Sequence, residues 1–209
     1  GRTAWFVWRS GGSAALRRRL SAADRHAAHA GSPDYQAWIQ RHERYSAEQI
    51  ADMRTWVEAL KHRPRISIVM PVYNAPERWL REALDSVLAQ LYPYWELCIA
   101  DDHSGQPRVR AVLDEYRQRD RRIKVVYRDR NGHISAASNS ALELASGEFV
   151  AFMDQDDLLS EYALYHVVRA IQEYPEAGLI YSDEDKIDAK GERYAHYFKP
   201  DFNLDLMLS

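Results

Sequence analysis

Short apolar runs alternate with helix-period segments along most of this chain, from residue 65 onward. The runs are nearly continuous in apolar residues, as expected when helices cover both faces of a mainly parallel sheet. The pattern therefore predicts an α/β fold built from βαβ repeats, in which the short apolar runs are the strands. We expect strands at 66–72, 95–100, 123–127, 148–153 and 178–181, and helices at 77–90, 108–119, 135–145 and 161–173.

The part of the chain before this alternation differs in kind and predicts an N-terminal helical extension, residues 1–63. Ser32-Pro33-Asp34 is a helix-start signal, and apolar residues then recur at three- and four-residue intervals as far as Leu60. This predicts two amphipathic helices whose apolar stripes cover a flank of the main domain, which we place at 64–209. Residues 1–31 predict a frayed or loosely helical lead-in without chemistry.

Charge is distributed unevenly between the two parts. Residues 1–65 carry a net charge of +6 and the remainder −9, giving −3 overall. The acidic main part argues against a nucleic-acid partner, which requires a basic footprint. The basic first part suits contact with an anionic membrane surface or an acidic partner, or simply solvated helix faces, and these readings stay open.

The compartment is inferred from what the sequence lacks. No run approaches the roughly 18 to 20 apolar residues that span a bilayer, and the start carries no export signal. We therefore expect a cytoplasmic location, with possible peripheral attachment to the inner face of the membrane. Cys98 lies inside the apolar run 95–100 and reads as a buried small hydrophobe in a reducing compartment.

Polar residues follow three of the expected strands. They form the segments PVYN at 71–74, DDHS at 101–104 and DQDD at 154–157. Ligands of open α/β sheets bind at the carboxyl ends of the strands, so these segments are the first candidates for a site. Five carboxylates near one sheet edge are costly unless a cation or hydrogen-bond donors compensate.

Asp154 and Asp156 are two residues apart, so in extended backbone their carboxylates project to the same side. Mg²⁺ and Mn²⁺ prefer oxygen ligands and are usually held by one or two carboxylates together with phosphates and water. The alternative is helix capping, because Asp156 and Asp157 precede the helix expected at 161–173. From the residues alone, both readings stay open.

The other strand-end residues are ambiguous in the same way. Asp102 is either an ordinary turn residue or an acceptor for the N–H of a pyrimidine base. Asn131-Gly132-His133 is a turn signal before a helix of small residues, which allows close approach of backbone or ligand. Asn139 in that helix is either solvated or faces a pocket. His103 and His133 lack metal-ligand spacing and read as turn residues.

These motifs, in this order, resemble the family 2 glycosyltransferases, which have the GT-A (Rossmann-like) fold. The matching text is ISIVMPVYN at 66–74, ELCIADDHS at 96–104 and NGHISAASNSALELASGEFVAFMDQDDLL at 131–159. The continuation, YSDEDKID at 181–188 and FKPDFN at 198–203, is similar to bacterial O-antigen and rhamnan-type enzymes.

The resemblance implies roles for particular residues. Asp154 and Asp156 would hold Mn²⁺ or Mg²⁺, and Asp102 would hold the pyrimidine. Many relatives have an arginine where this chain has Ser138, so a contact made by that arginine is absent here. The nucleotide-sugar site would be formed by Pro71, Val72, Tyr73, Asn74, Asp102, Asn131, Asn139, Asp154 and Gln155.

The implied reaction is metal-dependent, inverting transfer from a UDP- or dTDP-linked sugar to a hydroxyl of a growing polysaccharide or lipid-linked saccharide. A general base must deprotonate that hydroxyl, and in this family it comes from a segment that we expect beyond Ser209. A donor-binding module without independent turnover is therefore an alternative. A receiver-type Mg²⁺-binding domain would need an acidic pair after the first strand, and a nucleotidyltransferase would need a Gly-rich basic loop there; this chain has neither.

Overall fold

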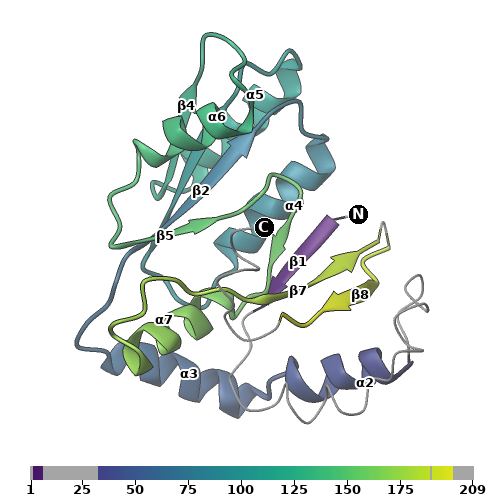
Figure 1. Ribbon diagram of the computed structural model, residues 1–209, viewed down its shortest axis with the longest axis vertical. Helices are drawn as coiled ribbons and strands as arrows, with labels where there is room; N and C mark the ends of the chain where they lie inside the picture. Colours follow the sequence, from purple (N-terminus) through teal and green to yellow (C-terminus); the bar gives the residue numbers. More distant parts are fainter. Residues whose placement is uncertain (1, 7–32, 189, 200–209) are drawn as a thin grey trace.

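The computed structural model describes residues 2–6, 33–188 and 190–199, and its centre is a four-stranded parallel sheet (Figure 1). The strands lie in the order β4-β3-β2-β5, so that the first strand of the repeat, β2, is internal. This confirms the predicted parallel α/β architecture. The strands are β2 (Ile66–Val72), β3 (Trp95–Asp101), β4 (Ile123–Tyr127) and β5 (Phe149–Phe152).

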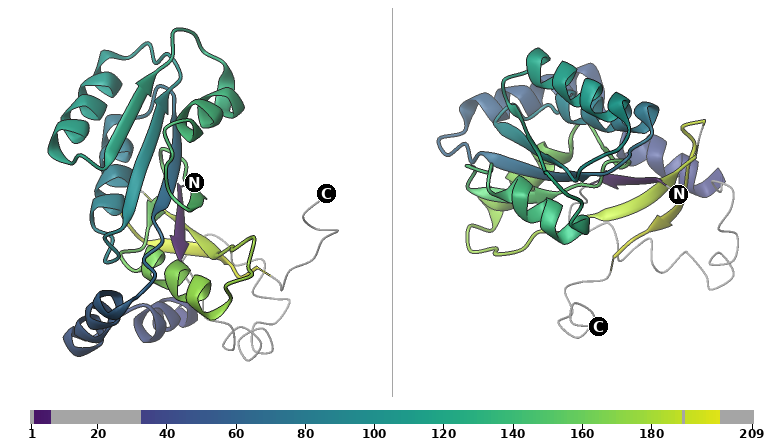
Figure 2. Two further views of the ribbon diagram at one scale, coloured as in Figure 1. Left: turned by 90° about the vertical axis from the view of Figure 1, so that its left-hand side faces the viewer. Right: turned by 90° about the horizontal axis from the view of Figure 1, so that it is seen from above.

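Helices cover both faces of this sheet (Figure 2). On one face, α4 (Glu77–Leu88) and α5 (Pro107–Arg119) pack over the larger side chains of β2 and β3, such as Ile68 and Leu97. On the other face, α6 (His133–Leu142) packs through alanines against Val69 and Cys98. Cys98 is buried, as expected, and burial raises the pKa of its thiol to about 11. Small residues on this face let α6 approach the sheet closely.

A second sheet lies beside the first, with its strands in the order β6-β1-β7-β8. Its strand β1 runs parallel to β6 and antiparallel to β7, and β7 runs antiparallel to β8. The N-terminal segment thus contributes a strand to the sheet that follows the main repeat. The strands are β1 (Arg2–Phe6), β6 (Leu158–Leu159), β7 (Asp183–Ile187) and β8 (Arg193–Tyr197).

This second sheet corrects two predictions. Residues 2–6 form a strand instead of a loosely helical lead-in, because their pairing partner lies about 180 residues away and local periodicity cannot reveal it. The strand expected at 178–181 is absent; Leu179 and Tyr181 are exposed there, and the strand begins at Asp183 instead. An apolar run forms a strand only where a neighbour supplies the hydrogen bonds. The rest of the lead-in, 7–32, lies outside the described residues.

The two helices expected before the main domain are present as α2 (Pro33–His42) and α3 (Ala47–Ala59). A capping box between Ser46 and Gln49 starts α3. Met53 of α3 joins the main core, and Trp56 packs edge-on against Tyr165 of α7 (Ala163–Glu173), with ring centroids 5.3 Å apart. The predicted cover of a domain flank is therefore confirmed for α3.

Helix α2 packs instead against the second sheet. Tyr35 stacks on His196 of β8, and its hydroxyl donates to the buried carboxylate of Asp185 in β7. Arg193 pairs with the same carboxylate and with Glu43. Burial raises the pKa of Asp185 to about 6, although Arg193 and the Tyr35 hydroxyl oppose that rise. None of the described helices is both long and apolar enough to cross a bilayer.

A buried carboxylate anchors the connection between α6 and β5. Glu96 of β3 accepts hydrogen bonds from Ser67 at 2.7 Å and from the backbone of Ser146, and it pairs with Lys124 at 2.9 Å. Burial alone would raise the pKa of Glu96, but these donors lower it to about 2. Gly147 follows, and a Cβ there would lie 2.6 Å from the Ser67 hydroxyl. This network fixes the start of β5, and hence the strand that leads to 154–157.

Candidate functional site

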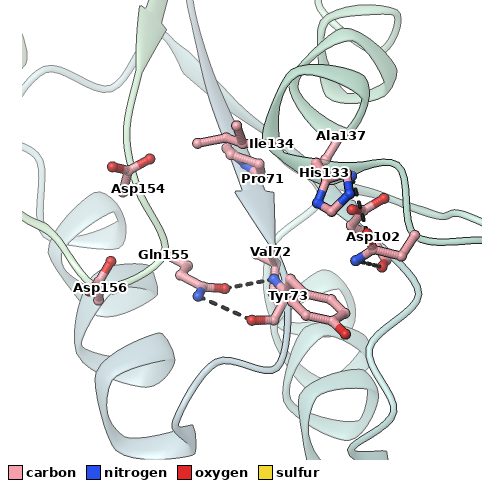
Figure 3. A pocket seen from close by; sticks show the side chains of 11 residues that line it. Pro71, Val72, Tyr73, Asp102, His133, Ile134, Ala137, Asp154, Gln155 and Asp156 are labelled. Carbon is pink, nitrogen blue, oxygen red and sulfur yellow. Dashed lines mark hydrogen bonds between the residues drawn. The ribbon is translucent and has the colours of Figure 1, made fainter.

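A cavity of about 400 Å³ opens at the carboxyl ends of β2, β3 and β5, beside the first turn of α6 (Figure 3). This is where an open α/β sheet is expected to bind its ligand. Of the ten predicted site residues, eight line the cavity, and Asn74 and Asn139 do not. The cavity is lined by Pro71, Val72, Tyr73, Asp102, Asn131, His133, Ile134, Ala137, Asp154, Gln155 and Asp156.

The loops after β2 and β3 are tied together behind the cavity. Asn74 has a left-handed backbone, with φ of 47°, which Asn tolerates better than most residues. Its N–H donates to the Ser104 hydroxyl at 2.8 Å, and its side-chain oxygen accepts from Gly105 N–H at 3.0 Å. Asn74, predicted as a ligand residue, thus lies outside the lining and joins the two loops.

Asp102 sits at the inner wall of the cavity and is 2% exposed. Both of its carboxylate oxygens accept the backbone N–H of Gly132, at 3.0 and 3.1 Å. Arg128 Nε lies 2.8 Å from Asp102 Oδ1, and the same guanidinium donates to Ala136 O at 2.7 Å. The carboxylate therefore lines the cavity and also holds the 128–132 loop against α6.

Arg128 was not singled out from the sequence, and it explains why position 132 is glycine. A Cβ on Gly132 would lie 2.6 Å from Arg128 Nη2 and 2.9 Å from Ala136 Cβ. Arg128 also donates to Ser140 of α6. This chain thus places a guanidinium against the lining residue Asp102 from the position after β4, whereas position 138 carries a serine. No local pattern marks Arg128, because its partners are all on other elements.

The first turn of α6 forms the upper wall. Asn131 lines the cavity as predicted, and its side-chain amide donates to Asp102 O at 3.3 Å. His133, predicted as a turn residue, has φ of 63° and also lines the cavity, together with Ile134 and Ala137. These three share one helix face, which the helical period could have revealed. Asn139 points elsewhere: it is exposed and outside the lining.

The segment after β5 supplies the acidic wall. It forms a turn, with Asp157 N–H donating to Asp154 O at 3.2 Å, so the extended backbone expected there is wrong. Asp154 and Asp156 nevertheless both line the cavity. Partial burial raises the pKa of Asp154, and the charge of Asp156 raises it further. The two like charges are therefore close enough to repel each other, which a bound cation would relieve.

The capping alternative is not supported by this geometry. Helix α7 begins at Ala163 and its N-cap is Tyr162, without a side-chain cap. Asp156 and Asp157 therefore lie too far upstream to cap it. Asp157 and Asp101 are both buried and outside the lining, so only three of the five strand-end carboxylates reach the cavity.

The donor set fits a hard divalent cation that is completed by a substrate. Carboxylate oxygens are the ligands that Mg²⁺ and Mn²⁺ prefer, and phosphates and water commonly fill the remaining positions. Among the described residues, no group of three or more His, Cys, Asp or Glu side chains could hold a metal by itself. A cation at Asp154 and Asp156 would thus depend on oxygen atoms brought by a ligand.

An open parallel sheet with a polar cavity at its strand ends defines an α/β ligand-binding domain. Residues 67–207 match the glycosyl transferase family 2, and the chain belongs to this family. The expectation drawn from the three motifs is thereby confirmed, and the chain is a glycosyltransferase domain.

The chain is similar in sequence to three relatives that differ in identity and coverage. It is 41% identical over 178 residues to the O-antigen biosynthesis protein RfbC of Myxococcus xanthus, which covers 84% of this chain and 14% of the relative. It is 50% identical over 151 residues to protein y4gI of Sinorhizobium fredii, covering 72% and 17%. It is 41% identical over 93 residues to the UDP-Glc:alpha-D-GlcNAc-diphosphoundecaprenol beta-1,3-glucosyltransferase WfgD of Escherichia coli, covering 44% and 35%. The matched part thus spans about a sixth of the first two relatives.

Proposed function

We propose that this chain binds the nucleoside-diphosphate sugar donor of a metal-dependent, inverting glycosyl transfer. The observation that carries the proposal is the meeting of two kinds of residue in one cavity of about 400 Å³. Tyr73, Asp102 and Asn131 form what we call the base half of the cavity. Asp154 and Asp156 form what we call the carboxylate half. A nucleoside diphosphate is a ligand with a hydrogen-bonding base at one end and charged phosphates at the other.

The base half suits a pyrimidine. Tyr73 is about half exposed (48%), and its ring offers a flat apolar surface for a base to lie on. Asp102 is held at the wall by Gly132 and Arg128, so its orientation is fixed before a ligand arrives. A carboxylate accepts hydrogen bonds only, and the N3–H of uracil or thymine is a matching donor. These features support a UDP- or dTDP-linked donor.

The carboxylate half suits the diphosphate together with a cation. Asp154 and Asp156 would hold Mn²⁺ or Mg²⁺, which supplies neutralisation of the charge on the departing diphosphate. The protein's own contribution is to place two carboxylates beside the base half and to keep them oriented. Fixed charges aimed at a leaving group need no reorganisation during the reaction.

The relatives support a particular kind of donor and acceptor. The name of WfgD describes transfer from UDP-Glc to a saccharide on diphosphoundecaprenol, and the name of RfbC describes a protein of O-antigen biosynthesis. We therefore propose that the whole protein extends a cell-surface polysaccharide or its lipid-linked precursor. Such an acceptor suits work at the cytoplasmic face of a membrane, with peripheral attachment.

The general base is proposed to lie in another part of the whole protein. The three acids of β7 are already engaged: Asp183 accepts Lys199 N–H at 2.7 Å, Glu184 pairs with the Lys199 side chain, and Asp185 pairs with Arg193. These contacts favour, as the second candidate, a donor-binding module that needs the remainder of the protein for transfer. The boundary between the N-terminal extension (1–63) and the main domain (64–209) stays a prediction from the sequence.

Thermal unfolding against a ligand panel tests the proposal. We expect UDP or dTDP to raise the melting temperature of the chain only modestly alone and clearly more with Mn²⁺, because bound ligand stabilises the folded state. Asp156→Ala should abolish the Mn²⁺-dependent part, whereas Asp52→Ala on the exposed surface of α3 should not. Failure of every nucleoside diphosphate to stabilise the unaltered chain would contradict donor binding.

A further inference from the structure

The two halves of the cavity are carried by segments that separate at its edge. Strands β2 and β5 pair in parallel from Ile66 to Val69, and Met153 N–H then donates to Val69 O at 3.1 Å. Beyond that point β2 runs on to Val72 and Tyr73 follows it, while 154–157 forms its own turn. The cavity lies where the segments part, so something other than sheet pairing must set the distance between them.

One side chain spans this separation. Gln155 Oε1 accepts the backbone N–H of Tyr73 at 2.8 Å, and Gln155 Nε2 donates to Tyr73 O at 3.2 Å. Figure 3 shows the carboxamide directed at Tyr73, with Asp154 and Asp156 on either side of it in the chain and directed away. A single carboxamide thus satisfies both hydrogen-bonding groups of one residue, as a neighbouring strand would.

This pairing depends on the length and the chemistry of the side chain. An amide offers a donor and an acceptor side by side, which neither a carboxylate nor a thioether does. Asparagine carries the same group on a side chain one methylene shorter and cannot reach Tyr73 from the same backbone position. Because Asp154 and Asp156 flank Gln155, restraint of Gln155 also restrains the two carboxylates.

We propose that Gln155 is a positioning residue that sets the spacing between the base half and the carboxylate half. It acts through the Tyr73 backbone and need not touch the ligand. The inference rests on the proposed function, since it assumes a ligand that spans both halves. A ligand confined to one half does not sense the spacing, whereas a nucleoside diphosphate with its metal must fit both halves at once.

Replacement of such a positioning residue should therefore weaken the coupling between UDP binding and Mn²⁺ binding. If two ligands bind cooperatively, each raises the affinity for the other by the same factor. Removing the Gln155 hydrogen bonds should lower that factor for UDP and Mn²⁺ while leaving the affinity for UMP alone within about twofold. Because one hydrogen bond is typically worth a few-fold to about tenfold in an equilibrium constant, we expect the coupling factor to fall about tenfold.

Isothermal titration of the 209-residue chain tests this with Gln155→Met, which matches the volume of glutamine without its hydrogen bonds. Gln155→Asn keeps the amide group on a side chain too short to reach Tyr73, so it should lower the coupling factor as Gln155→Met does. Gln118→Met, on the exposed surface of α5, is the matched control and should keep the full coupling factor. Melting temperatures should stay within about 2 °C of the unaltered chain, because the two hydrogen bonds are exposed.

The outcomes separate the inference from the proposed function. Loss of coupling between UDP and Mn²⁺ in both Gln155 variants, with the UMP affinity retained, supports the positioning role of Gln155. A coupling factor unchanged in Gln155→Met, or equal weakening of UMP and UDP binding, would overturn this role and leave donor binding intact. If UDP with Mn²⁺ fails to bind the unaltered chain, the proposed function falls and the inference falls with it.

Discussion

The backbone N–H of Gly132 donates to both carboxylate oxygens of Asp102, at 3.0 and 3.1 Å. The turn at Gly132 thereby orients the Asp102 carboxylate, which we propose accepts a hydrogen bond from the nucleotide base. The absence of a side chain at position 132 is what admits the Arg128 guanidinium beside it. Local backbone geometry and the electrostatics of the cavity wall are thus set by the same few residues.

Gly132→Ala should damage this wall. Its Cβ would lie 2.6 Å from Arg128 Nη2, so the guanidinium must move and weaken its pairing with Asp102. We expect a loss of about 1 to 3 kcal/mol in the free energy of unfolding and a weaker affinity for UDP. Urea titration and calorimetric binding measure the two effects. Gly105→Ala is the control, since a Cβ there meets nothing within 4 Å.

Substitution of Asn131 and of Asn139, two asparagines that the sequence predicts as site residues, should affect UDP affinity differently. Asn131 lines the cavity and bonds the backbone of Asp102, so Asn131→Ala should weaken UDP binding several-fold. Asn139 is exposed and outside the lining, so Asn139→Ala should change the affinity by less than twofold. Equal effects of the two substitutions on the dissociation constant would show that the cavity is not where the nucleotide binds.

Glu96→Gln should destabilise the chain and flatten its response to acid. The donors around Glu96 lower its pKa to about 2, below the ordinary value of 4.5, so its stabilising effect is complete above about pH 4.5 and is lost as the pH falls toward 2. Replacement should cost on the order of 3 kcal/mol at pH 7, because Lys124 loses its charged partner.

Denaturant unfolding at pH 7 and at pH 3 checks this prediction. The difference in unfolding free energy between the unaltered chain and Glu96→Gln should shrink at pH 3. Glu148→Gln is a suitable control, because the pairing of Glu148 with His62 is about half exposed and should be worth under about 1 kcal/mol. A gap of the same size at both pH values would mean that the Glu96 charge is not what stabilises the network.

Tyr35→Phe should loosen helix α2. The substitution removes a hydrogen bond to Asp185, whose other carboxylate oxygen is already buried without a hydrogen-bond partner. We expect a cost of about 2 kcal/mol and faster proteolysis within 33–42, while the cavity, whose lining includes neither Tyr35 nor Asp185, keeps its affinity for UDP. Proteolysis that is unchanged would show that aromatic stacking with His196 suffices to dock the helix.

The main sheet could be predicted from the sequence because its determinants are local. The apolar runs that became β2 and β3 are buried on both faces, and the helices between them carry clear apolar stripes. The second sheet could not be predicted, because β1 pairs with a strand distant in sequence and the apolar run 178–181 pairs with no strand in the part of the chain that the structure describes. Pairing between remote segments is a property of the folded chain.

The site likewise contains residues that the sequence predicts and residues that only the folded structure reveals. Strand-end position identified Tyr73, Asp102, Asp154 and Asp156, which the structure brings to one cavity. Arg128 escaped notice because only its contacts reveal it. Asn74 was chosen for its place beside Tyr73, but its left-handed backbone turns it toward the next loop.

The dependence of UDP affinity on Mn²⁺ tests the central claim most directly, because it requires the base half and the carboxylate half to act on one ligand. Titration calorimetry of the unaltered chain and of Asp156→Asn, each with and without Mn²⁺, gives the four dissociation constants. We expect Mn²⁺ to tighten UDP binding at least tenfold in the unaltered chain and by less than twofold in Asp156→Asn. Mn²⁺-dependent tightening that is the same in both proteins would contradict a donor site built on these carboxylates.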